Sequence, residues 1–219
     1  MESIYETTGK KALAQTKELE AMASELGEAA VQETLVREAA MVTAKKVLDI
    51  ARLELGTKES PPDSNNVKYN SWFYGRPVSG RDYAWCMVFI QWLFCQAGKK
   101  LPYITASCSA LLNWYNANRP SRVVKTPQPG DIIIYSFGHT GIVETVGSDG
   151  TITAIEGNTS SSDAGSQSNG GMVCRRKRTT STVKAYIRPD YEKGNDMNID
   201  KISAEAGSAD AERAWQAAR

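Results

Sequence analysis

The sequence contains too little cysteine and histidine for a disulfide-stabilised domain or a structural zinc site. It has one histidine, and its four cysteines are spread over a chain of 219 residues. Structural zinc sites need closely spaced cysteine and histidine pairs. Disulfide-stabilised domains are short and rich in cysteine. Both classes are therefore disfavoured.

Net charge and long apolar segments are also scarce. The formal net charge is +1, which gives no reason to expect a nucleic acid partner. No stretch reaches the ~18 consecutive apolar residues of a membrane-spanning helix, so no membrane span is expected. The first residues, MESIYETTGKK, lack the apolar segment of a signal peptide, and we expect none.

The pattern of apolar residues predicts helices followed by strands. Helical spacing runs through residues 10–55, where Gly27 is expected to break the helix and Gly56 to end it. Further helices are predicted at 86–97 and from Ser107. Strands are predicted at 131–136, 139–146, 151–158 and 182–189. This order predicts an α+β fold with the helices packed on an antiparallel sheet.

Cys86 lies in the first turn of a predicted helix, CMVFIQWLFCQA. Cys95 is nine residues further on, on the opposite side of that helix, so the two cannot form a disulfide with each other. A helix N-terminus lowers the pKa of a thiol. Cys86 is therefore either a nucleophile or, as is more common for a cysteine among apolar neighbours, a small core residue.

A predicted hairpin brings the histidine close to a carboxylate. If Gly147 and Gly150 close a two-residue turn, His139 lies opposite Asn158. Glu156 is then one diagonal step away on the same face. A shift of the strand register by one residue would separate these side chains.

Cys86, His139 and Glu156 together match the requirements of a cysteine hydrolase. An imidazole activates the thiol and protonates the leaving group, and a carboxylate orients the imidazole. Each residue also has a purely structural explanation, and Glu144, on the opposite face of the hairpin, is a competing carboxylate. We favour the catalytic interpretation because all three residue types coincide.

Six segments in this order resemble the CHAP domain, the cysteine- and histidine-dependent amidohydrolase/peptidase family, related to papain-like and NlpC/P60 enzymes. They are ARLELGTKESPPDSNNVKYNSWFYG, AWCMVFIQWLFCQAG, QPGDIIIYS, GHTGIVETV, AIEGNT and VCRRKRTTSTVKAYIRP. The last resembles a closing hairpin. The combination of WC, GHxGIV and EGN is the specific part of the resemblance.

The resemblance implies a papain-like α+β fold over residues 42–190, preceded by a helical arm, 1–41, and followed by a polar, alanine-rich, weakly helical tail, 191–219. It also implies hydrolysis of an amide bond in bacterial peptidoglycan, by an N-acetylmuramoyl-L-alanine amidase or a stem or cross-bridge endopeptidase. By position, Cys86 would be the nucleophile, His139 the general base and acid, Glu156 the orienting acid and Asn158 a fourth supporting residue.

The loop at residues 56–85 is the expected substrate side. Its candidate substrate-binding residues are Asn66, Tyr69, Trp72, Tyr74 and Trp85; packing of Tyr69 and Trp72 on the core is the alternative. Glu59, Asp63 and Asp82 are the acids of this loop, too few for the six to eight oxygens of calcium without carbonyl ligands. We therefore expect no required cofactor or metal, with calcium as the alternative. The basic run RRKR, 175–178, is expected to be a solvated face or a site of attraction to the anionic wall.

We expect a lysin of phage or mobile-element origin that acts extracellularly on the cell wall, after lysis or as part of a virion or secretion apparatus. The helical arm is expected to be a solvated helix, to bind another protein or to self-associate. Two alternatives stay open: a catalytic or passive module of a larger assembly, such as a phage tail or secretion machine, and a papain-like hydrolase of a non-wall substrate.

Overall fold

The computed structural model describes residues 24–33, 36, 41–162 and 164–192. Val42–Glu192 form one compact unit, and the description below concerns this unit. The predicted arm and tail lie largely outside the described residues. Within the arm, residues 24–33 are helical. Gly27 lies inside that helix, so the prediction that Gly27 breaks it was wrong.

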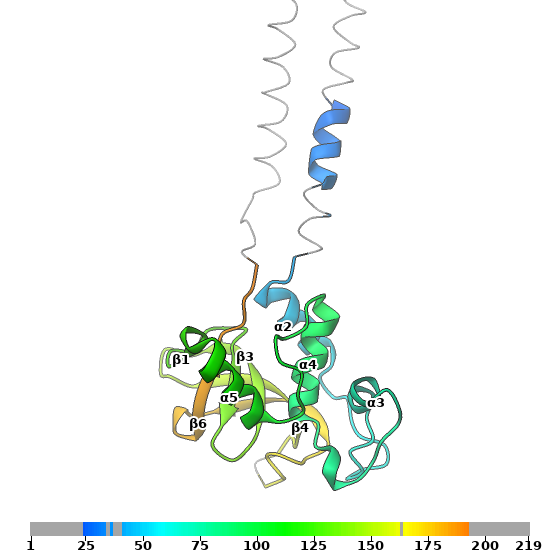
Figure 1. Ribbon diagram of the computed structural model, residues 1–219, viewed down its shortest axis with the longest axis vertical. Coiled ribbons are helices and arrows are strands. Elements are labelled where there is room, and N and C mark those ends of the chain that lie inside the picture. Colours follow the sequence, from blue (N-terminus) through cyan, green and yellow to red (C-terminus); the bar gives the residue numbers. More distant parts are fainter. Residues whose placement is uncertain (1–23, 34–35, 37–40, 163, 193–219) are drawn as a thin grey trace, which may run out of the picture. The chain divides into compact units, whose positions relative to one another are not determined.

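The compact unit places its helices before its strands (Figure 1). The helices are α2 (Ala44–Leu53), α3 (Lys68–Tyr74), α4 (Cys86–Ala97) and α5 (Cys108–Asn118), with 3-10 turns at Arg81–Tyr83, Pro120–Arg122 and Thr180–Thr182. The strands are β1 (Val123–Val124), β2 (Ile132–Tyr135), β3 (Thr140–Val146), β4 (Ile152–Thr159), β5 (Met172–Arg178) and β6 (Val183–Ile187). Among the described residues, no helix is both long and apolar enough to cross a bilayer.

The predicted helix over residues 10–55 is interrupted before α2. Residues 41–43 are not helical, and Thr43 caps α2 by accepting a hydrogen bond from the backbone N–H of Lys46 at 3.2 Å. A threonine at this position satisfies one of the free N–H groups that every helix start leaves. The apolar spacing continued through the cap and hid the boundary.

The strands form one antiparallel sheet in the order β1-β6-β2-β3-β4-β5. This confirms the predicted α+β class. The segment read as a closing hairpin is not one, because β5 pairs with β4 whereas β6 pairs with β2 and β1. Its two strands are therefore separated by β2, β3 and β4.

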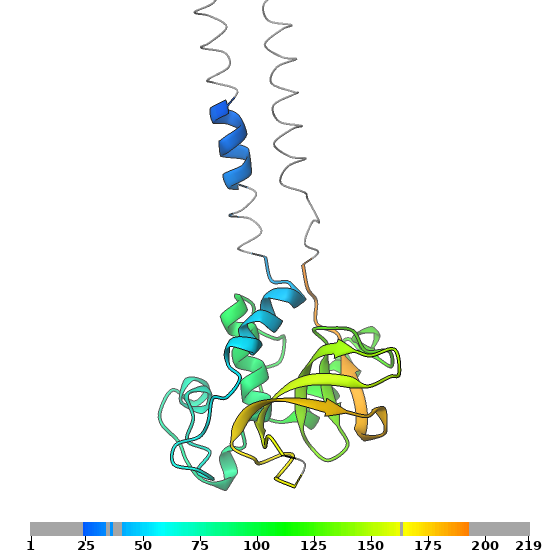
Figure 2. The same ribbon diagram turned by 180° about the vertical axis from the view of Figure 1, so that it is seen from behind.

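The main core lies between the helices and one face of the sheet. Ile132 and Ile134 of β2 join this core, whereas Ile133 and Tyr135 belong to a smaller cluster on the other face. This alternation is the period-two pattern of a strand with both faces covered. α4 is buried over most of its residues and packs against β3, β4 and α2 (Figures 1 and 2).

The β3–β4 hairpin contains two irregularities that compensate each other. Gly147 pairs with Thr151 rather than Gly150, so the loop is one residue longer than predicted. Glu144 is an extra residue in β3, where the register shifts between Val143 and Thr145. Beyond this bulge, β3 and β4 have the predicted register.

Candidate active site

Cys86 is the first residue of α4, and the start of this helix has no side-chain cap. Trp85 holds the N-cap position without accepting a side-chain hydrogen bond. The first-turn N–H groups and the helix dipole therefore act on the Cys86 sulfur. The backbone N–H of Met87 bonds to that sulfur and helps to lower the pKa of the thiol. The Cys86 residue is 5% exposed.

Gly157 allows α4 to approach the sheet at this point. A Cβ atom on Gly157 would lie 2.7 Å from Cβ of Phe89 and 2.8 Å from the ring of Trp85. Any side chain would therefore push the helix away from β4. The glycine of the EGN sequence thus brings the start of α4 close to the strand that carries Glu156.

The predicted contact between His139 and Glu156 is present. Nε2 of His139 and Oε2 of Glu156 are 3.1 Å apart, and both side chains are completely buried. The register that faces them toward each other results from the longer turn and the Glu144 bulge together.

Gly141 makes room for this contact. A Cβ atom on Gly141 would lie 2.6 Å from Cγ of Glu156, a distance that real Cβ atoms do not tolerate. The Glu156 side chain therefore passes over the backbone of Gly141 to reach His139. In the GHTGIV segment, the second glycine is a spatial requirement of the carboxylate on the neighbouring strand.

Two further residues fix the carboxylate of Glu156. Arg178 donates from Nε to Oε1 at 2.8 Å and from Nη2 to Oε2 at 2.5 Å. The hydroxyl of Tyr135 donates to Oε1 at 2.7 Å. Burial acts to raise the pKa of Glu156, but the bonds from Arg178 and His139 keep this pKa below its ordinary value. Glu156 is therefore held as a buried, fully bonded anion.

Aromatic rings fix the plane of the imidazole. Tyr135, Phe137 and His139 stack on one another with ring centroids 5.1–5.9 Å apart and interplanar angles of 11–17°. Phe137 is 40% exposed, so it forms the solvent-facing end of this stack. The aromatic stack and Glu156 leave the ring little freedom to rotate.

His139 also interacts with the Cys86 thiol, an interaction that lowers the pKa of Cys86 and raises that of His139. Nε2 of His139 is bonded to Glu156, whereas Nδ1 is buried without a hydrogen-bond partner among the described residues. Burial acts to lower the pKa of His139, but its interactions with Cys86 and Glu156 raise that pKa to about 9. A protonated imidazole beside Cys86 favours the thiolate form of the cysteine.

A second thiol, which sequence reasoning missed, also contacts Cys86. Sγ of Cys108, at the start of α5, lies 3.7 Å from Sγ of Cys86. This hydrogen bond, together with His139, holds the pKa of Cys86 well below its ordinary value against the effect of burial. The same contact and burial raise the pKa of Cys108. Either sulfur can be the donor of this S–H···S bond.

The structure places Asn158 and Glu144 outside this cluster. The side chain of Asn158 is bonded to Asn65 (3.4 Å), Asn169 (3.3 Å) and the N–H of Gly171 (3.3 Å). It therefore joins two loops and makes no hydrogen bond to His139. The competing carboxylate, Glu144, is bonded to Arg52 and Arg175, so Glu156 is the carboxylate that partners the histidine.

Of the candidate substrate-binding residues, Tyr69 and Trp85 are completely buried. Their rings contact each other at 5.3 Å, and Nε1 of Trp85 donates to the buried Glu59 at 2.8 Å. They anchor the loop to the core and have no surface to offer a substrate. Trp72 is 37% exposed.

Asn66 and Tyr74 are partly exposed. The side chain of Asn66 donates to the carbonyl of Ser60 at 2.9 Å, and the ring of Tyr74 packs edge-to-face on Tyr83. Neither contacts the Cys–His–Glu cluster through a hydrogen bond among the described residues.

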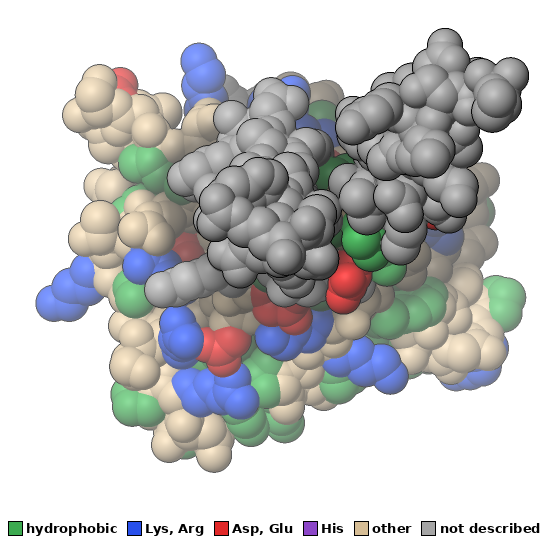
Figure 3. Space-filling view, turned by 90° about the horizontal axis from the view of Figure 1, so that it is seen from above, with side chains coloured by type: hydrophobic (Ala, Val, Ile, Leu, Met, Phe, Trp, Pro, Cys, Tyr) green, Lys and Arg blue, Asp and Glu red, His purple; other side chains and the backbone are tan. Residues whose placement is uncertain are grey.

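The basic run in β5 is divided, because Arg176 and Arg178 are engaged inside the protein whereas Arg175 and Lys177 are exposed, as a solvated face requires. Arg178 binds Glu156 with a side chain that is 9% exposed, and Arg175 binds Glu144. Arg176 is buried and donates to the carbonyl of Ser161. In the face shown in Figure 3, some Lys and Arg side chains lie beside Asp and Glu side chains, and others stand apart from them.

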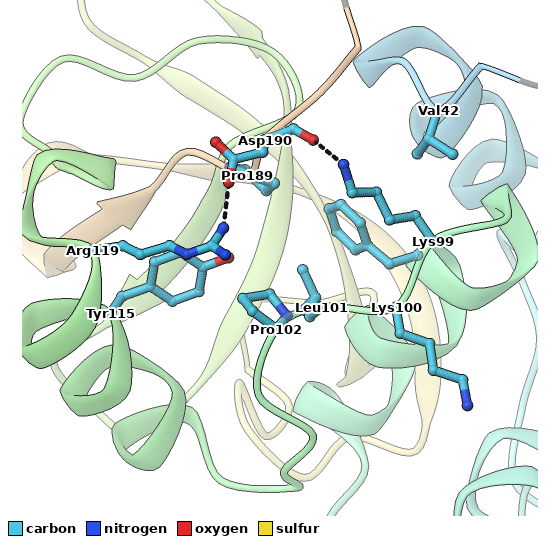
Figure 4. A pocket seen from close by; sticks show the side chains of 10 residues that line it. Val42, Lys99, Lys100, Leu101, Pro102, Tyr115, Arg119, Pro189 and Asp190 are labelled. Atoms are coloured by element: carbon cyan, nitrogen blue, oxygen red, sulfur yellow. Dashed lines mark hydrogen bonds and ion pairs between the residues drawn. The ribbon is translucent and has the colours of Figure 1, made fainter.

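In a pocket away from the cluster, Arg119 and Lys99 both bind Asp190 (Figure 4). It is lined by Val42, Phe94, Lys99, Lys100, Leu101, Pro102, Tyr115, Arg119, Pro189 and Asp190. Asp190 pairs with Arg119 and Arg122, and its carbonyl accepts from Lys99. These bonds fasten the segment after β6 to α5. Across the described residues, no group of three or more His, Cys, Asp or Glu side chains has a metal-binding arrangement.

A known family model matches the part of the chain that contains the site. Residues 78–158 match the family model of the CHAP domain, a range that includes Cys86, His139 and Glu156. No curated protein matches the chain. A solved structure entitled "Crystal structure of a wild type endolysin LysIME-EF1" is similar at 20% identity and a TM-score of 0.44, over 69% of this chain and 66% of that one. The family match agrees with the CHAP resemblance over residues 78–158.

Proposed function

We propose that this CHAP-domain protein hydrolyses an amide bond of bacterial peptidoglycan with Cys86 as the nucleophile. The observation that carries the proposal is the arrangement of three side chains from distant segments. A cysteine with a lowered pKa lies at an uncapped helix start beside an imidazole whose far nitrogen is bonded to a buried carboxylate. This is the arrangement that nucleophilic acyl transfer requires.

In the proposed reaction, the Cys86 thiolate attacks the carbonyl carbon of the scissile amide. The backbone N–H of Cys86 is a donor to the oxyanion that forms. His139 gives its proton to the departing amine, and the thioester remains on Cys86. His139 then accepts a proton from water as this water attacks the thioester, which releases the product.

Glu156 has an orienting role in this proposal. It holds Nε2 of His139, so that Nδ1 faces the nucleophile, and it stabilises the imidazolium. Arg178 and Tyr135 hold the carboxylate in place. The nucleophile, the general acid and base, and the orienting group are all protein side chains, so the proposed reaction needs no metal. Activity is therefore expected to survive chelation of metal ions with EDTA.

The test is hydrolysis of purified cell walls by the wild type and by Cys86→Ala and His139→Ala. Each substitution is expected to reduce turnover by about three orders of magnitude or more, because members of such a unit act together. Cys95→Ser is the matched control, since Cys95 lies on α4 outside the cluster, and it should retain wild-type activity. Near-normal turnover of either cluster variant would overturn the mechanism.

The bond that is cut distinguishes an amidase from an endopeptidase. Mass spectrometry of the released fragments answers this directly. An amidase separates the lactyl group of the glycan from L-alanine, and an endopeptidase leaves two peptide fragments with new amino and carboxyl ends. Failure of the wild type to release any fragment from walls, together with hydrolysis of other peptides, would favour a papain-like hydrolase of a different substrate.

A further inference from the structure

The contact between Cys86 and Cys108 has no role in the proposed hydrolysis step itself. The two sulfur atoms are 3.7 Å apart and belong to residues 22 positions apart in the chain. Both thiols are free. They are the first residues of α4 and α5, so each is at a helix end, where side chains adjust more readily than in the middle of a helix.

The geometry is close to that of a disulfide. A bond of about 2.05 Å requires the two sulfur atoms to approach by about 1.7 Å from their 3.7 Å separation. Residues 99–107, directly before Cys108, contain no helix or strand. Gln91 of α4 holds this segment by hydrogen bonds to the carbonyls of Tyr103 and Thr105. The start of α5 is thereby kept beside the start of α4 in the reduced protein.

The two thiols differ in their pKa shifts, and this difference decides which of them reacts first with an oxidant. Cys86 is the more acidic thiol and therefore the one that attacks an oxidant. The contact with Cys86 and burial raise the pKa of Cys108, so Cys108 is the slower of the two thiols to react with the oxidant. Both residues are nearly buried, at 5% and 7% exposure, which admits a small peroxide more easily than a bulky reagent.

We propose that Cys108 is a resolving thiol that forms a reversible disulfide with Cys86 when the protein meets a peroxide. The disulfide removes the nucleophile and thereby switches off the activity proposed above. It also protects Cys86 from irreversible oxidation. Only the effect on activity rests on the proposed function; the formation of the disulfide does not.

The chemistry balances with peroxide as the oxidant. The Cys86 thiolate attacks one peroxide oxygen, the O–O bond breaks, and the leaving oxygen takes a proton to become water or an alcohol. The sulfur of Cys108 then attacks the sulfenic acid on Cys86, the S–O bond breaks, an S–S bond forms and water leaves with the thiol proton. Two thiols are oxidised and one peroxide is reduced. An external dithiol reverses the process by exchange.

The test uses the full chain treated with hydrogen peroxide and analysed by mass spectrometry. The wild type is expected to lose the mass of two hydrogen atoms. After digestion with trypsin, which cleaves at Lys99 and Lys100, Cys86 and Cys108 should appear on two peptides joined by a disulfide. The Cys95→Ser and Cys174→Ser variants are the controls and should form the same link. Reduction with dithiothreitol should restore the original mass and the activity.

Cys108→Ala and Cys108→Ser separate the resolving role from simple packing, and circular dichroism checks that both variants fold. In both, peroxide is expected to add oxygen to Cys86, and dithiothreitol should no longer restore activity after prolonged exposure. Addition of oxygen to the wild type without a Cys86–Cys108 link would overturn the proposal. A clean link in a protein that releases nothing from walls would leave the disulfide established and remove the proposed function.

Discussion

Cys86 and Cys108 occupy the same position in two helices, and their sulfur atoms touch, yet their surroundings give them opposite properties. Each is the first residue after the N-cap. The pKa of Cys86 is held well below its ordinary value, whereas that of Cys108 is raised. A position at a helix N-terminus is therefore not sufficient to activate a thiol.

Two differences explain the contrast. The start of α5 is capped by Ser107, whose hydroxyl accepts from the N–H of Ala110 at 3.2 Å, whereas Trp85 provides no such cap to α4. In addition, Cys86 interacts with an imidazole, whereas the side-chain hydrogen bond of Cys108 is to the sulfur of Cys86. The free helix start and the imidazole together distinguish a candidate nucleophile from its neighbour.

The largest expected effect is the difference in reactivity between the two thiols. At pH 6, Cys86 should react with a small alkylating agent at least about 100-fold faster than Cys108, because each unit of pKa changes the thiolate fraction tenfold. Peptide mapping after timed alkylation measures both rates in one sample. In His139→Gln, the rate of Cys86 should fall toward that of Cys108. Equal rates in the wild type would contradict the comparison.

The next effect comes from displacing the carboxylate that orients His139. Gly141→Ala places a Cβ atom within 2.6 Å of Cγ of Glu156. A displacement of about 1 Å costs about 100-fold in rate when it misaligns a catalytic group. We expect kcat on walls to fall by this amount while the fold is retained. Gly27→Ala, where a Cβ atom meets nothing within 4 Å, is the control and should be neutral.

The pH profile sharpens the comparison further. Activity should rise as Cys86 loses its proton, at a pH below the ordinary range of a thiol, and fall as His139 loses its proton near pH 9. In Cys108→Ala, loss of the S–H donor should move the acid limb to higher pH and leave the alkaline limb in place. An alkaline limb near pH 6.5 would show that His139 lacks the stabilisation described above.

The smallest effect concerns the cap of α5. Ser107→Ala removes the hydrogen bond to the N–H of Ala110, which should cost about 1 kcal/mol of unfolding free energy. Ser107→Gly should lower the free energy of unfolding by only a few tenths of a kcal/mol. Urea denaturation of the three proteins measures the difference. Because uncapping frees N–H groups beside Cys108, its alkylation should also become faster in Ser107→Ala, and an unchanged rate would argue against a role for the cap.

Sequence patterns predicted the pairing of His139 with Glu156 correctly, partly because two structural irregularities cancel each other. The predicted two-residue turn was one residue too short, and the Glu144 bulge, which alternation alone does not reveal, restored the register. The helix of Cys86 and the α+β order followed from apolar spacing, which reports burial directly. Neither the bulge nor the longer turn changes that spacing enough to be read from the sequence.

The residues that sequence reasoning missed act across distant segments. Arg178 lies in a run of four basic residues that looks like a solvated face, yet its partner is 22 positions earlier in the chain. Cys108 had no signal beyond its helix position. Tyr69 and Trp85 were read as substrate-facing because aromatic residues in a loop suit both recognition and anchoring. Only the fold shows that these two are in the core.

The Glu144 bulge has a practical consequence. Arg52 and Arg175 form hydrogen bonds to Glu144, which lies in β3 between the hairpin turn and the Cys–His–Glu cluster. The tip of the hairpin, Ser148–Gly150, is exposed. Exposed loop tips tolerate inserted sequence. The hairpin end should therefore tolerate a peptide tag or a wall-targeting module inserted between Ser148 and Gly150. The hydrogen bonds from Arg52 and Arg175 to Glu144 should keep β3, which follows His139, in register.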